Sequence, residues 1–121
     1  MESAPSTTTN YSFSINHAPE TNGMSDLNVD LLSVKKAAIV LRAINHKLRQ
    51  IILKLIDERG KITVTELYTH LRLEQSVASQ HLAILRKAGF VKTTRDGKFI
   101  YYAVNHDRLV ELNKFVKELL G

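Results

Sequence analysis

The chain has 121 residues, a formal net charge of +5 and no cysteine, which excludes disulfides, thiolate metal sites and thiol catalysis. It has no apolar run near the roughly 20 residues that cross a bilayer and no signal-peptide pattern, so we expect a single cytoplasmic domain without a membrane anchor. All seventeen basic residues lie in 27–121, against nine acidic ones. That balance suits a polyanionic partner such as nucleic acid, and it suits a merely basic soluble protein equally well.

Residues 1–25 are rich in Ser, Thr and Asn and show no helical or strand period. Such a segment cannot bury enough apolar surface to offset its ordering entropy, so we predict a flexible tail before a folded domain over 26–121. From Leu27 to Leu41, apolar residues recur at spacings of three and four. This spacing predicts an amphipathic helix, with Asp26 as its candidate cap.

A second helix is predicted over 46–58, followed by a short extended piece over 61–63. The apolar face of this second helix is Leu48, Ile51, Ile52, Leu55 and Ile56. Thr63 and Glu66 have the spacing of a capping box, in which each side chain bonds the other residue's backbone N–H. They predict the start of a third helix over 64–71.

After a fourth helix over 75–88, the apolar period falls to two in 90–95 and 98–104. The Asp96-Gly97 link between these runs predicts a tight β-hairpin with positive φ at both central residues. A last helix is predicted over 107–120. The fold class is therefore mainly α with a small β-hairpin, in the order of a winged helix-turn-helix, with a minor strand before the third helix.

The helices over 64–71 and 75–88 form the predicted helix-turn-helix. The inward stripe of the second of them is Val77, Ala78, Leu82 and Leu85. Its outward face is polar and has no acid after Glu74. Gln and Ser suit the edges of bases in a major groove, so this is the candidate recognition helix. The candidate DNA contacts are Gln75, Ser76, Ser79, Gln80, His81, Arg86 and Lys87. The alternative is a Ser/Gln-rich surface without a ligand.

The hairpin over 90–104 is the candidate wing. Arg95 and Lys98 place two cations beside its turn, where they can contact phosphates or a minor groove. Edge strands also carry Lys and Arg to stay soluble. The position of the hairpin directly after a recognition helix favours the first interpretation.

Residues 42–104 resemble the ArsR family of winged-helix repressors. The resemblance is carried by His46–Leu53, Val64–Leu67, Gln75–Val91 and Arg95–Tyr102, most specifically by Ser-Gln-His-Leu and Leu-Arg-Lys-Ala-Gly. It implies a homodimer formed by the first and last helices, which binds an imperfect palindrome in double-stranded DNA and blocks transcription. One departure is Glu74, where family members often have Ser; this puts Glu74 itself in doubt as a contact.

Wide apolar stripes on the first and last helices agree with a two-fold dimer. The candidate interface residues are Leu31, Val34, Ala38, Leu41, Leu109, Leu112, Phe115, Val116 and Leu119. The alternative is that these two helices pack on each other within one subunit.

Many members of the ArsR family sense metals, but the ligands of the family's last-helix site are replaced. The first ligand pair of that site falls on His106 and Arg108, and its C-terminal partners fall at Leu119 and beyond. A weaker set would be His106, Asp107 and Glu111. Two interpretations stay open for His81: packing inside the helix-turn-helix, or contact with DNA. We expect no metal, no cofactor and no enzyme, since no catalytic motif is present. A metal sensor with an atypical site and a protein-interaction module remain the alternatives.

Overall fold

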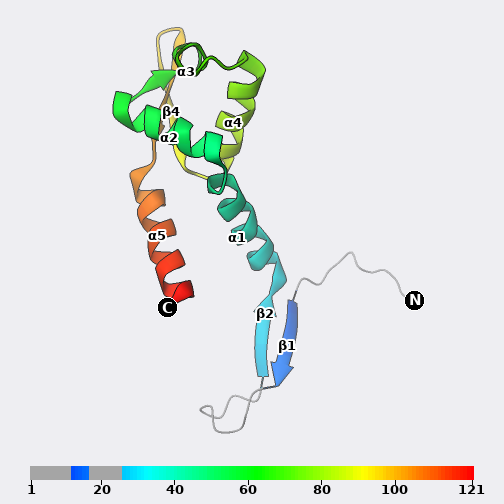
Figure 1. Cartoon of the computed structure of the whole chain (residues 1–121). Coiled ribbons are helices and arrows are strands. Elements are labelled where there is room, and N and C mark those ends of the chain that lie inside the picture. The colour runs from blue at the N-terminus through cyan, green and yellow to red at the C-terminus, as the bar shows by residue number, and fades with distance from the viewer. Residues whose placement is uncertain (1–11, 17–25) are drawn as a thin grey trace, which may run out of the picture. The chain divides into compact units, whose positions relative to one another are not determined.

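The computed structural model describes residues 12–16 and 26–121, and the chain divides into two compact units, 1–39 and 40–121. The elements, in chain order (Figure 1), are β1 (Ser12–Asn16), β2 (Asp26–Asp30), α1 (Leu31–Ile44), α2 (Lys47–Arg59), β3 (Ile62–Thr63), α3 (Val64–Leu71), α4 (Gln75–Lys87), β4 (Val91–Asp96), β5 (Phe99–Val104) and α5 (His106–Leu120).

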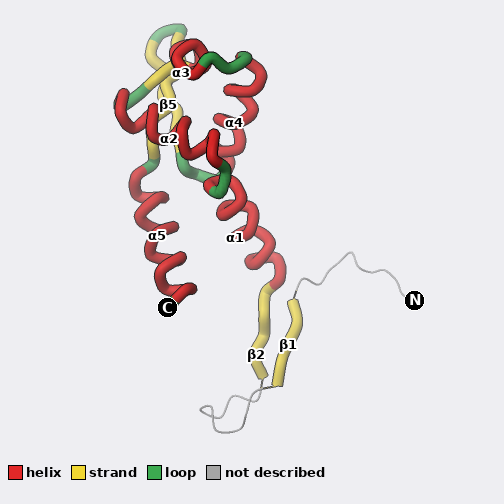
Figure 2. Tube along the Cα trace, in the orientation of Figure 1, coloured by secondary structure: helices red, strands yellow, loops and turns green. Residues whose placement is uncertain are grey.

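The first unit corrects the prediction for the N-terminal segment. β1 lies inside the predicted tail and pairs antiparallel with β2, which runs directly into α1 (Figure 2). The helix therefore begins at Leu31, and not near Leu27. Asp30, and not Asp26, caps it by accepting from the backbone N–H of Leu32 at 3.0 Å. The rest of the predicted tail, 1–11 and 17–25, lies outside the described residues.

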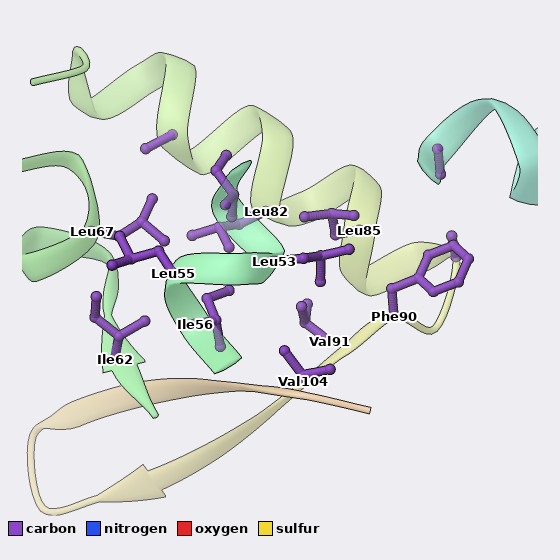
Figure 3. Packing of buried hydrophobic residues seen from close by; sticks show 14 residues of the cluster. Leu53, Leu55, Ile56, Ile62, Leu67, Leu82, Leu85, Phe90, Val91 and Val104 are labelled. Carbon is purple, nitrogen blue, oxygen red and sulfur yellow. The ribbon is translucent and has the colours of Figure 1, made fainter. Parts of the chain in front are cut away.

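The second unit has the predicted winged helix-turn-helix architecture. It combines helices α2 to α5 with a three-stranded antiparallel sheet in the order β3-β5-β4. Leu82 and Leu85 point from α4 toward the apolar side chains of α2, and Val91 and Val104 close the core at the base of the hairpin (Figure 3). This core fixes the orientation of α4, because the buried side of that helix is apolar along its length.

Local signals decide most helix boundaries. The Thr63–Glu66 capping box is present as predicted, with both backbone bonds formed, and α3 covers the predicted residues. The apolar face of α2 was predicted incorrectly in part. Ile51 is 43% exposed, whereas Leu53 is buried in its place.

The hairpin turn is displaced by one residue from its predicted position. Asp96 still pairs with Phe99, so the two central residues are Gly97 and Lys98. Gly97 has φ +63°, and among the described residues Arg72 is the only non-glycine with a positive φ. Positive φ at the first central residue alone is the pattern of a type II′ turn, in which glycine is favoured at that position.

We predict that Thr63→Ala lowers the free energy of unfolding by about 1 kcal/mol, because it leaves the N–H of Glu66 without its side-chain acceptor. Thr63→Ser should retain most of that stability. Thr65→Ala is the matched control, since Thr65 is exposed in the same helix and makes no cap. Urea unfolding measures all three variants, and an equal loss for Thr63→Ala and Thr65→Ala would contradict the role of the cap.

Candidate nucleic-acid interface

The amphipathic character of α4 sets which of its side chains reach solvent. Ala78, Leu82 and Leu85 are at most 1% exposed. The polar and basic side chains predicted to contact DNA lie on the opposite side and are exposed, with His81 partly buried between the two faces. The exposed residues are Gln75, Ser76, Ser79, Gln80, Arg86 and Lys87. The helix therefore presents a continuous hydrogen-bonding surface without an acid.

The turn before α4 is closed by backbone bonds at the end of α3. Arg72 has φ +57°, and its N–H bonds Thr69 O at 3.3 Å while the N–H of Leu73 bonds Tyr68 O at 2.9 Å. These two bonds form a Schellman motif, with Arg72 in the left-handed position that usually takes glycine. The motif ends α3 abruptly and lets α4 begin two residues after Leu73.

Glu74 precedes α4 without making a side-chain cap bond. The first N–H groups of α4 therefore have no side-chain acceptor from this position, at the end of the helix where the dipole is positive. This agrees with the expectation that Glu is a poorer cap than Ser.

A buried guanidinium joins α4 to the end of α1. Arg49 is 7% exposed, and its Nε and Nη2 donate to the carbonyl oxygens of Ala43 at 2.6 Å and Arg42 at 3.0 Å. Its Nη1 lies 3.2 Å from Nδ1 of His81. Arg49 thus satisfies carbonyls in the last turn of α1, where a cation also suits the helix dipole, and holds one side chain of α4.

Two histidine rings meet beside this guanidinium. His46 caps α2, since its Nδ1 accepts from the N–H groups of Leu48 and Arg49, and its ring centroid lies 4.9 Å from that of His81. A guanidinium can only donate, so Nδ1 of His81 accepts and the neutral ring carries its proton on Nε2. Burial lowers the pKa of His81, and the nearby His46 and Arg49 lower it further.

The wing carries its cations at the tip. Arg95 and Lys98 are exposed, and Nε of Arg95 donates to Gly97 O at 3.3 Å across the turn. Lys98 lies over the ring of Phe99, at 5.5 Å from its centroid. Burial is confined to the base of the hairpin, so its outer half projects into solvent.

Side chains from the start of α5 fasten the junction between α4 and the wing. Asn105 Nδ2 donates to Gly89 O at 3.0 Å, and Arg108 Nε donates to Ala88 O at 3.0 Å. Gly89 has φ +88°, and a Cβ there would meet Arg108 Nε at 3.1 Å. The junction therefore requires glycine, both for its backbone conformation and for the close approach of the guanidinium.

Comparison with known proteins identifies the fold's family. The model of "Bacterial regulatory protein, arsR family" matches residues 46–93. An HTH-type transcriptional regulator of Methanocaldococcus jannaschii is 39% identical over 85 residues, which cover 70% of this chain and 96% of that protein. The chain belongs to the arsR family. This membership confirms the predicted class of the chain, a DNA-binding transcriptional regulator and not an enzyme.

Two further matches have solved structures. The transcriptional repressor PagR of Bacillus anthracis is 30% identical over 97 residues, covering 78% of this chain and 94% of PagR. Its crystal structure matches with a TM-score of 0.57 over 70% of this chain and 97% of that one. NolR from Sinorhizobium fredii matches at 31% identity with a TM-score of 0.59, covering 73% and 87% of the two chains.

The residues at the arsR family's last-helix metal position do not fit a metal. Arg108 is a cation whose Nε is bonded to Ala88 O, and His106 Nε2 lies 2.7 Å from Asp57 Oδ1 instead of joining Asp107 and Glu111. Within residues 12–16 and 26–121, no three His, Cys, Asp or Glu side chains are grouped to hold a metal ion. In the same part of the chain, no helix combines the length and apolarity of a bilayer span.

The predicted dimer residues lie largely on solvent-accessible helix faces. No residue of α5 is buried, and Phe115 and Leu119 are 42% and 65% exposed. On α1, Leu31 and Val34 are 37% and 53% exposed. Ala38 is exposed too, whereas the remaining candidates are half-buried: Leu41, Leu109, Leu112 and Val116.

We predict that His81 makes this arsR-family chain less stable in mild acid. Its folded-state pKa is lowered, so the unfolded chain binds the proton first as the pH falls through the ordinary histidine range, about 6.5. The free energy of unfolding should therefore decrease between pH 7.5 and pH 5. His81→Gln keeps an acceptor for Arg49 and cannot be protonated, so its decrease should be smaller. Urea unfolding at each pH measures this, and identical pH profiles would contradict it.

Proposed function

We propose that this chain represses transcription in the cytoplasm by binding an imperfect palindrome in double-stranded DNA as a homodimer. The observation that carries the proposal is the exposed, acid-free face of α4, supported from below by Ala78, Leu82 and Leu85. Such a face suits the major groove, because Gln and Ser can bond base edges there and the neighbouring phosphates disfavour unpaired carboxylates. PagR, which is named a transcriptional repressor, supports repression as the outcome.

The N-terminal half of α4 is proposed to read bases. Gln75, Ser76 and Ser79 are exposed near the helix start, which is the part of a recognition helix that meets base edges. Gln80 extends the same surface by a further polar group. His81 can add the N–H on Nε2, since Arg49 occupies the other ring nitrogen. Each good bidentate contact contributes about 1–3 kcal/mol of discrimination.

Phosphate contacts are proposed for four cations at the two ends of the surface. Arg86 and Lys87 lie at the end of α4, and Arg95 and Lys98 lie at the tip of the wing. Contacts of this kind fix the register of the protein on the duplex and carry no sequence information themselves. They also make affinity fall steeply as salt is added.

The homodimer is proposed to pair the apolar faces of α1 and α5. Phe115 and Leu119 on α5, and Leu31 and Val34 on α1, are large apolar side chains that are 37–65% exposed in the described part of the chain. A two-fold interface covers the same face on both copies at once. It would place the two α4 helices for half-sites roughly 34 Å apart, one turn of DNA.

Substitutions should separate base reading from phosphate contact. Gln75→Ala is expected to weaken binding to the operator by about 1–3 kcal/mol with little effect on random DNA, because it removes a base contact. Arg95→Ala is expected to weaken both and to lower the slope of log affinity against log salt by about 1. Fluorescence anisotropy with operator and scrambled duplexes, measured at several salt concentrations, gives all of these values.

The matched controls are Asn113→Ala, which removes an amide from α5, and Lys54→Ala, which removes an exposed cation from α2. Neither should change affinity or salt dependence. Equal losses on operator and scrambled DNA for Gln75→Ala would rule out its role in reading bases.

The dimer makes a separate prediction. Phe115→Asp should raise the dimer dissociation constant by about ten- to a hundredfold, since covering such a side chain contributes roughly 1.5–3 kcal/mol. Asn113→Asp introduces the same group two residues earlier in α5 and serves as the control. Sedimentation equilibrium gives both constants; a wild-type protein that stays monomeric at all concentrations contradicts the proposed dimer.

A further inference from the structure

The described part of the first unit exposes its apolar side chains. None of its residues whose side chains the structure describes, within 12–15 and 27–39, is buried. Large apolar side chains are nevertheless frequent there and are 37–53% exposed: Phe13, Ile15, Leu27, Leu31, Leu32, Val34 and Ile39. We call β1, β2 and residues 31–39 of α1 the N-terminal arm.

The hairpin of the N-terminal arm is amphipathic. Phe13 pairs with Val29 and Ile15 pairs with Leu27, so these four side chains share one face of the two strands. The opposite face carries short polar groups, with Ser14 opposite Asn28. A one-residue shift of the register would mix the two faces, so the observed pairing is the one that gathers all the apolar groups on one side.

An amphipathic hairpin of this size needs a cover. Two isolated strands are marginally stable in water, and they become stable when an apolar face packs on something else. β2 runs directly into α1, because the strand ends at Asp30 and the helix begins at Leu31 (Figure 2). Further exposed apolar side chains follow at Leu31, Leu32 and Val34. The carboxylate of Asp30 joins strand and helix by accepting from Leu32 and Ser33.

We infer that the N-terminal arm packs against the same arm of a second copy of the chain and extends the dimer interface beyond α1 and α5. The inference rests on the proposed homodimer. It adds the apolar face of the hairpin to the dimer interface. An isologous contact pairs the same apolar face of both copies, so it buries the exposed apolar side chains of each copy at once.

Charge and position select a second copy over other occupants. The chain has no Lys or Arg before Lys35, so the hairpin has none of the cations that DNA or an anionic membrane surface would require. Leu31 and Val34 belong both to the arm and to the proposed dimer face of α1. The arm lies before residues 46–93, the part matched by the arsR family model.

The test compares two substitutions in one strand of the full chain. Ile15→Asp places a carboxylate on the apolar face of the hairpin, and Ser14→Asp places the same group on the polar face one residue away. Sedimentation equilibrium should show a dimer dissociation constant at least tenfold higher for Ile15→Asp and within twofold of wild type for Ser14→Asp. Phe13→Ser repeats the test without a charge. Hydrogen exchange of the wild-type protein should show protection of residues 12–16 and 26–30 that increases with protein concentration.

The outcomes separate this inference from the proposed function. If Phe115→Asp dissociates the dimer while Ile15→Asp and Phe13→Ser leave it intact, the arm has no part in it and the inference is wrong, although the dimer stands. If Ile15→Asp lowers the melting temperature equally at all concentrations without changing the dissociation constant, the arm packs on its own subunit, which also overturns the inference. If the wild-type chain is monomeric at all concentrations, both the proposed dimer and this inference are wrong. The proposed DNA binding is then tested by the anisotropy measurements alone.

Discussion

The burial of one stripe of α4 determines what the rest of the helix can do. Ala78, Leu82 and Leu85 occupy the core beneath the helix, so rotation of α4 about its axis would expose them to water and bury Gln and Ser groups without partners. Each fully buried leucine contributes roughly 1.5–3 kcal/mol to this preference. The outward direction of Gln75, Ser76 and Ser79 is therefore a consequence of core packing.

One guanidinium group contacts the middle of α4 and another bonds the residue that follows the helix. Arg49 bonds carbonyls at the end of α1 and reaches His81 in the middle of α4, whereas Arg108 comes from α5 and bonds Ala88 O just beyond its end. Both satisfy carbonyl groups at a helix C-terminus that would otherwise lack partners. Single side chains thus connect α4 and its C-terminal end to α1 and α5, the two helices proposed to form the dimer.

Features governed by local chemistry were predictable from the sequence. The Thr63–Glu66 capping box, the alternation in β4 and β5 and the apolar stripe of α4 each depend on residues within a few positions of one another. The DNA contacts and dimer residues stay predictions, although the exposure of Gln75 and Arg95 agrees with them. The burial of Arg49 could have been predicted, because its spacing from Ile52 and Ile56 places it on the buried side of α2. A buried cation requires hydrogen-bond partners.

Features that depend on distant pairing were not predictable. Leu27 and Leu31 have a helical spacing, whereas Leu27 and Val29 have the two-residue spacing of a strand. The strand forms because Leu27 and Val29 pair with Ile15 and Phe13. The hairpin turn moved by one residue because Asp96 pairs with Phe99, which leaves Gly97 to take the positive φ. The bond from Arg108 to Ala88 joins residues 20 apart and has no local sequence signal.

Selection of bound duplexes from random DNA tests the central claim, that the exposed face of α4 reads DNA in two symmetric copies. The purified full-length chain is expected to enrich sequences with two inverted half-sites whose centres are about 10 base pairs apart. The Gln75→Ala variant should relax the preference at matching positions in both half-sites. Enrichment of no sequence at low ionic strength, or the same enriched motif with and without Gln75, would contradict the account.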